Sequence, residues 1–230
     1  MKPIISSRLG RLTVAVATMW LPWILRRPIL TLLLGYRLDP SSRIGLSIVA
    51  AASVEIGKGG RIGHLTVCRG IKSLQLDDYA RIGNLNWITG NGDAPLPRSG
   101  SENLAQPGLK VGKHSAITHR HYIDCSDSIS IGVFSTIAGV RSQFLTHSID
   151  IQRNRQQACP ITIGNYCFVG TGCIVLGGSA LPDCSVLAAG TLLREKLDQS
   201  WMLYAGIPAQ AKKEIPKDYG YFSRAEGFVD

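Results

Sequence analysis

The sequence predicts an all-β fold in which the chain winds into a parallel β-helix. The first observation is an aliphatic residue at every sixth position: Ile163, Val169, Val175, Leu181, Leu187 and Leu193. The second is a small residue four positions after each of the first five: Cys167, Cys173, Ser179, Ser185 and Thr191. A period of two would indicate a strand and a period of about 3.6 a helix, so a period of six requires another geometry. We interpret six residues as one side and one corner of a triangular coil, with the aliphatic residue inside.

The same period continues toward the N-terminus with interruptions. Pairs of Ile or Val followed by Gly mark the repeats independently, and they begin at Ile62, Ile82, Val111, Ile131 and Ile163. Their spacing predicts coils of about eighteen residues, some of them lengthened by two residues at a corner. The 25 glycines agree with this interpretation, because corners require backbone conformations that glycine adopts most readily.

Two insertions interrupt the repeats, and loops that leave a rigid scaffold commonly carry function. The first, roughly residues 90–108, is rich in Gly, Pro, Ser and Asn, and is either a functional loop or a tolerated surface insertion. The second, roughly residues 148–160, is polar and basic. It directly follows His147, which favours a functional role.

The composition divides the chain into an apolar basic helical segment (1–43), a β-helix (44–213) and a C-terminal tail (214–230). Residues 1–43 hold seven Lys and Arg against one acid, so they supply most of the formal charge of +9. The uncharged run Leu12–Leu25 is shorter than the ~20 residues that span a bilayer. We expect two short helices, hinged at Pro22 or Pro28, that bind an anionic membrane surface, cap the first coil, or do both.

Other classes of protein are disfavoured. Nucleic-acid binding is not expected, because the basic residues share their segment with aliphatic bulk. The six cysteines show no CxxC spacing, and Cys167 and Cys173 are expected to be small buried residues of a reduced compartment. Arg26 and Arg27 follow the apolar run without a small-residue cleavage site, so no cleavable signal peptide is expected.

His147 is the strongest catalytic candidate, because it lies in FLTHSID between the end of a coil and the second insertion. A neutral imidazole can accept a proton from an attacking hydroxyl. A coil spacing of twenty residues would place Asp127 directly beneath His147, so Asp127 is the predicted orienting partner. Asp124 and Asp150 are the other nearby acids.

A second group of histidines precedes these acids. His119 and His121 would lie on one strand and point in the same direction, which we expect to be outward. Together with Asp124 they are candidates for binding a substrate. With His114 or a neighbouring subunit they could instead bind a metal ion, or they could simply be surface residues.

These motifs resemble the left-handed β-helix, or hexapeptide-repeat, acyltransferases. The resemblance rests on the six-residue ladder, on His147 before a loop and PITIGNYCFVGTG, and on the tail YAGIPAQAKK. It covers roughly residues 44–213. It is closest to the bacterial polysaccharide and sugar O-acetyltransferases of the colanic-acid, maltose and galactoside types, and its most specific parts are the His147–loop–PITIG arrangement and the AGIPA tail. The segment 1–43 is not part of the simpler sugar acetyltransferases.

The resemblance implies a homotrimer with active sites between subunits, acetyl-CoA as acyl donor, a saccharide acceptor and no metal. His147 would act as general base in direct transfer, without an acyl-enzyme. Motif matching assigns cofactor binding to nine residues: Phe168 (in place of a common Trp), Gly170, Thr171, Ala188, Ala189, Gly190, Arg194, Lys212 and Lys213. The sequence departs from the family pattern at Glu195 and Gln210, where the resemblance implies basic residues. The family often has Asn where His119 and His121 lie.

Three other functions stay open at this point. One is N-acylation of an amino-sugar nucleotide, since a fold does not fix the acceptor. Another is a metal site like that of the γ-class carbonic anhydrases, suggested by the spacing of His114 and His119. The third is a non-catalytic scaffold. The expected location of the transferase is the cytoplasm, peripherally on the cytoplasmic face of the bacterial inner membrane.

Overall fold

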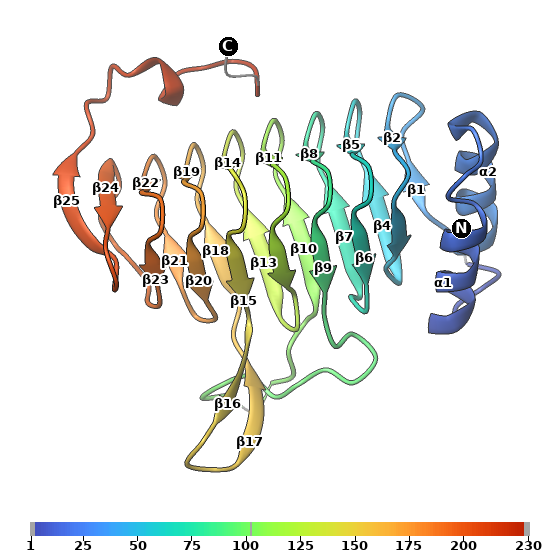
Figure 1. Ribbon diagram of the computed structural model, residues 1–230, viewed down its shortest axis with the longest axis horizontal. Helices are drawn as coiled ribbons and strands as arrows, with labels where there is room; N and C mark the ends of the chain where they lie inside the picture. The colour runs from blue at the N-terminus through green and yellow to red at the C-terminus, as the bar shows by residue number, and fades with distance from the viewer. Residues whose placement is uncertain (1–2, 102, 228–230) are drawn as a thin grey trace.

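The computed structural model describes residues 3–101 and 103–227, and it shows the predicted β-helix as three parallel sheets around a triangular core (Figure 1). Sheet A contains, in spatial order, β1 (Arg37–Leu38), β4 (Ser53–Ile56), β7 (Ser73–Leu76), β10 (Gly108–Val111), β13 (Ser128–Ile131), β18 (Ile161–Ile163) and β21 (Ala180–Leu181). Sheet B contains β2 (Arg43–Ile44), β5 (Arg61–Ile62), β8 (Arg81–Ile82), β11 (Ala116–Ile117), β14 (Thr136–Ile137), β19 (Phe168–Val169), β22 (Val186–Leu187), β24 (Met202–Ala205) and β25 (Gln210–Glu214). Sheet C contains β3 (Ile48–Ala50), β6 (Val67–Arg69), β9 (Trp87–Thr89), β12 (Tyr122–Asp124), β15 (Gln143–Leu145), β20 (Ile174–Leu176) and β23 (Leu192–Leu193).

The chain passes from sheet A to B to C in every coil, so the prism has an A–B, a B–C and a C–A corner. The pairing register confirms the expected coil lengths. Arg43 lies beside Arg61, eighteen residues on, and Arg61 lies beside Arg81, twenty residues on. The inward aliphatic positions of the sequence ladder, from Ile163 to Leu193, are no more than 1% exposed. Cys167 and Cys173 are fully buried free thiols, as predicted.

Two helices cover the open end of the first coil: α1 (Arg8–Ala17) and α2 (Trp23–Leu34) (Figure 1). The chain turns between them before Pro22, which precedes α2, whereas Pro28 lies inside α2. Leu30 and Leu34 bury their side chains against the first coil, and the hydroxyl of Tyr36 lies 3.1 Å from the carbonyl oxygens of Val49 and Ala51. Within the described residues, neither helix has the length and hydropathy to cross a bilayer.

The C-terminal tail runs back along the A–B corner, on the side of the prism opposite the hairpin (Figure 1). Rings at this corner stack with centroid distances of 4.8–4.9 Å, in the order Tyr79, His114, Phe134 and Tyr166. The short 3₁₀ helix η1 (Gly220–Phe222) brings Tyr221 to the corner, where its hydroxyl donates to the Cys167 carbonyl at 2.9 Å. The described part of the tail therefore adds a layer to the A–B corner.

Candidate functional site

His147 lies at the C–A corner, where the second insertion leaves the prism as a hairpin of β16 (His147–Asp150) and β17 (Arg155–Ala158) (Figure 1). Its backbone N–H donates to Asp124 Oδ2 at 3.2 Å. The side chain is partly buried, and its Nε2 atom is shielded from solvent without a hydrogen-bond partner among the described residues. Buried polar atoms are rarely left unpaired, so this nitrogen has hydrogen-bonding capacity that the described residues do not use.

The predicted orienting role of Asp127 is wrong. Its fully buried carboxylate accepts two hydrogen bonds from Arg98, at 2.7 and 2.9 Å, and others from the backbone N–H groups of Gln106 and Ser128. Burial alone would raise the pKa of Asp127, but these hydrogen bonds and the Arg98 charge outweigh burial and lower it. No hydrogen bond joins this carboxylate to the His147 ring within the described chain. Arg98 was missed in the sequence because it lies in an insertion without periodicity.

Arg98 belongs to the first insertion, and the structure shows that the two insertions are joined. Pro97 accepts a hydrogen bond from Ala158 N at 3.0 Å, and Ser99 N donates to the Ala158 carbonyl at 3.1 Å. Cys159 N then donates to Thr146 O, beside His147. The first insertion thus supports the hairpin on one side and, through Arg98 and Asp127, the corner beneath His147. The first insertion is therefore packed against the hairpin and the prism, and its functional role stays a prediction.

The carboxylate of Asp124 also accepts hydrogen bonds from backbone N–H groups. Its Oδ1 accepts from the N–H and hydroxyl of Ser126, at 2.9 and 2.6 Å, while its Oδ2 accepts from His147 N. The predicted role in substrate binding is therefore not what these contacts show. Asp124 is the acid that contacts His147, and it fixes the main chain from which the imidazole projects.

The expectation that His119 and His121 point in the same direction is wrong. Arg120 between them has φ +57°, so the chain turns a corner there and strand alternation does not apply. His119 is exposed at the B–C corner, and its Nδ1 accepts from Asn84 N at 2.9 Å. His121 is 1% exposed and faces the prism interior.

His121 is one step in a ladder of polar side chains inside the B–C corner. Each side chain accepts a hydrogen bond from the backbone N–H of its counterpart in the next coil. The ladder consists of Ser47, Thr66, Asn86, His121, Ser142 and Cys173. Nδ1 of His121 accepts from Ser142 N, so Nε2 carries the proton and donates to Thr118 Oγ1 at 3.0 Å. Burial, with a smaller effect of His119, lowers the pKa of His121 to about 4. His121 is a structural histidine.

A strip of small residues follows the outside of the B–C corner over three successive coils. Its members are Ala138, Gly139, Gly170, Thr171, Gly172, Ala188, Ala189 and Gly190, all exposed or half-buried except Gly170, which is buried. The amides of Gly139, Thr171 and Ala189 are at exposed residues and donate to no protein acceptor in the described chain. A Cβ at Gly172 or Gly190 would meet no atom within 4 Å. The strip is an open surface with unpaired donors, which suits an extended polar ligand. It includes five of the predicted cofactor residues and adds Ala138, Gly139 and Gly172.

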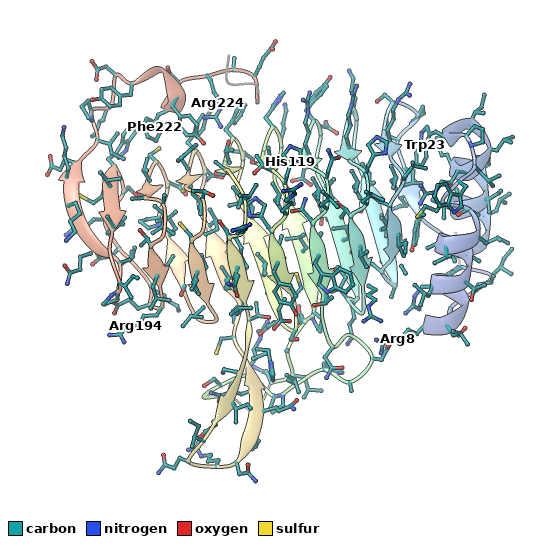
Figure 2. All side chains as sticks on the ribbon, in the orientation of Figure 1. Arg8, Trp23, His119, Arg194, Phe222 and Arg224 are labelled. Atoms are coloured by element: carbon teal, nitrogen blue, oxygen red, sulfur yellow. The ribbon has the colours of Figure 1, made fainter. Side chains whose placement is uncertain are left out.

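The remaining cofactor candidates lie elsewhere. Phe168 lies on the flat of sheet B, with its ring edge-on to Tyr221 at 5.8 Å, and lines an apolar pocket of about 350 Å³ beneath the tail. Arg194 is exposed after β23, on the same edge of the prism as the hairpin (Figure 2). Lys212 and Lys213 are exposed on β25.

The spacing of His114 and His119 does not produce a shared metal site in this chain. His114 lies at the A–B corner between the rings of Tyr79 and Phe134, and its Nδ1 accepts from Gly227 N at 3.2 Å. His119 lies at the B–C corner. In residues 3–101 and 103–227, no three His, Cys, Asp or Glu side chains gather as metal ligands.

His147 and the small-residue strip are on different corners of the same chain. The residues from Arg141 to Thr146 separate them and extend for roughly 20 Å at about 3.3 Å per residue. A ligand on the strip of one chain is therefore far from the His147 of that chain along the prism surface.

No family model matches the sequence, and no curated protein matches it either. Solved structures do match in fold. The hexapeptide-repeat acetyltransferase VCA0836 from Vibrio cholerae is 15% identical, with a TM-score of 0.51 over 91% of this chain and 90% of its own. The polysialic acid O-acetyltransferase OatWY is 16% identical, with a TM-score of 0.57 over 83% of this chain and 90% of its own. The chain therefore has the left-handed parallel β-helix fold of the hexapeptide-repeat acetyltransferases.

Proposed function

We propose that this protein is an acetyl-CoA-dependent O-acetyltransferase that acts on a saccharide hydroxyl. The observation that carries the proposal is the shielded, unpartnered Nε2 of His147 at the base of a braced hairpin. The fold supports it, since it is shared with VCA0836 and with OatWY, which is described as a polysialic acid O-acetyltransferase. The open strip at the B–C corner supports acetyl-CoA as the donor, because its free amides can bind the polar groups of a pantetheine arm.

His147 acts as the general base in this proposal. Its Nε2 takes the proton from the acceptor hydroxyl as the hydroxyl oxygen attacks the thioester carbonyl carbon. The carbon–sulfur bond then breaks, the acetyl group stays on the sugar oxygen, and the departing sulfur takes the proton from His147. General base catalysis of this kind contributes about 10²–10⁴-fold in rate. Asp124 positions the main chain of His147, and the joined insertions hold the hairpin over it.

The active unit that we propose is a homotrimer. In one chain the strip and His147 are on different corners, so the site is complete only if the B–C corner of one subunit faces the C–A corner of the next. His119, on the same corner as the strip, would then contact the acceptor from the neighbouring subunit. Exposed Arg194, Lys212 and Lys213 are the groups proposed to bind the CoA phosphates through charge-assisted hydrogen bonds.

The test measures release of free CoA from acetyl-CoA over a panel of neutral, acidic and amino sugars, with the mass of each product determined. An ester that alkali hydrolyses is the expected product, and an alkali-stable amide formed only on amino sugars would show N-acylation instead. Light scattering should give three copies of the 24.9 kDa chain. A monomer with full activity would contradict the shared site.

A further inference from the structure

The outer surface of the two N-terminal helices is apolar along its whole length. We call it the end face. It is formed by the exposed residues Leu9, Thr13, Val16, Ala17, Trp20, Leu21, Ile24, Leu25, Pro28 and Leu32. Leu9, Trp20 and Ile24 are 75%, 72% and 81% exposed. No part of the described chain lies beyond these helices (Figure 1). A contiguous exposed apolar surface of this kind marks an interaction site.

The side of each helix that faces the prism carries a buried arginine among apolar residues, whereas the opposite side is apolar and exposed. Arg26 is 1% exposed, and its guanidinium donates to the carbonyls of Gly45 and Ser47 at 2.7 and 2.6 Å. Burial lowers the pKa of Arg26 to about 10, so it stays charged at neutral pH. Arg11 is 8% exposed and lies 3.8 Å from Asp93. The two arginines and the buried apolar side chains of Ala15, Leu30 and Leu34 hold the helices to the prism, and the apolar side chains of the end face lie outside.

We propose that the end face docks on an anionic lipid bilayer, with the helices lying in the interface rather than crossing it. Helices of 10 and 12 residues are too short to span. The exposed Trp20 is a residue type enriched where water meets lipid. Residues 1–43 hold seven Lys and Arg against one acid, and this net charge attracts anionic headgroups although Arg11 and Arg26 face the prism. Arg8, at the start of α1, has a half-exposed side chain that lies 3.4 Å from Asp93 (Figure 2).

The same charge disfavours a second copy of this chain as the occupant. Two end faces in contact would bring together two segments that each hold seven basic residues and one acid. Like charges at an interface oppose association, whereas anionic lipid relieves the repulsion.

Docking of the end face on a bilayer would fix the distance between His147 and the lipid surface. It follows β15, four strand spacings along sheet C from β3, which lies in the coil next to the helices. At about 4.8 Å per strand, plus roughly 10 Å for the helix layer, His147 stands about 30 Å above the lipid surface. An acceptor attached to a lipid would reach it only through a long glycan.

The experiment is co-sedimentation of the full chain with vesicles of phosphatidylcholine alone or with phosphatidylglycerol added. We expect binding only when phosphatidylglycerol is present, weakened by salt. The double variant Leu9→Asp with Ile24→Asp should lose about tenfold or more of this binding, because both apolar side chains leave the interface. The control is Leu65→Asp with Ile151→Asp, which makes the same charge change at two exposed apolar residues elsewhere and should bind normally.

Equal loss in both double variants would overturn the proposal, since it would show a pure charge effect. So would a lack of sedimentation with either vesicle. Light scattering without lipid tests whether a second copy of this chain, instead of lipid, covers the end face. A native mass that is halved by Leu9→Asp with Ile24→Asp would show that it does. These outcomes do not depend on the proposed transferase activity, which is measured separately on soluble acceptors.

Discussion

Two histidines near opposite ends of sheet C strands, in consecutive coils, show how the same side chain is used in two ways. His121 precedes β12 and has both ring nitrogens hydrogen-bonded inside the prism. His147 follows β15 and has a shielded Nε2 without a partner in the described residues. A histidine whose nitrogens are both satisfied by the fold holds the fold together. A histidine with one shielded, unpaired nitrogen has capacity left for a substrate.

Replacing Arg98 should have the largest effect on stability. The change also tests the contacts that support His147 separately from the hydrogen-bond ladder that contains His121. Arg98→Ala leaves the buried Asp127 carboxylate without its cation, which costs about 3 kcal/mol of unfolding free energy. The hairpin and the His147 corner should loosen, while the B–C ladder is untouched. Urea unfolding and hydrogen exchange measure the two effects, and Arg153→Ala is the control because that arginine is exposed on the hairpin. Equal protection of the hairpin amides in wild type and Arg98→Ala would contradict the bracing role.

Acid should lower the free energy of unfolding, because His121 takes up a proton when the protein unfolds. The pKa of His121 is about 4 in the folded protein and about 6.5 when unfolded, so the unfolded state binds more protons between these values. Stability therefore falls as pH drops from about 6.5 to 4, by up to about 3 kcal/mol. His121→Asn keeps an acceptor for Ser142 N, as Asn86 does for His121 N in the preceding coil, and removes the titration. Unfolding free energies should depend less on pH in this variant, and an unchanged pH dependence would contradict the assignment.

A bulky side chain on the strip should weaken donor binding without affecting the fold. Ala189→Trp places a large ring beside an amide that we propose for acetyl-CoA, so KM for acetyl-CoA should rise about tenfold, the equivalent of about 1.4 kcal/mol. Leu65→Trp is the matched control, because Leu65 is exposed at the same corner, far from the strip along the prism. If both variants bind acetyl-CoA like wild type, the donor lies elsewhere.

Of these regions, the C-terminal tail should make the smallest contribution to stability. Tyr221→Phe removes one hydroxyl that donates to Cys167 O, at a cost of about 1 kcal/mol. Thermal unfolding should show a small shift, and KM for acetyl-CoA should not change. A large rise in KM would show instead that the tail and the pocket beside Phe168 take part in donor binding.

The β-helix could be predicted from the sequence because its core has a strict period. An apolar side chain at the right place in the six-residue period is enough to predict that a position is buried, as Val169 and Val175 show. The site could be predicted only in part. His147 was identifiable because it stands where the period breaks, but the positive φ of Arg120, which turns His121 inward, leaves no signal in a strand pattern. The partner of Asp127 could not be predicted, since an insertion of irregular sequence brings Arg98 to it from 29 residues away.

The most direct test of the account compares acetyl transfer by wild type and by His147→Ala, with acceptor and donor at saturation. The account predicts that kcat falls about 10²–10⁴-fold while KM for acetyl-CoA and the native mass stay as they were. A His147→Ala enzyme that keeps its trimer and a kcat close to that of wild type would contradict it.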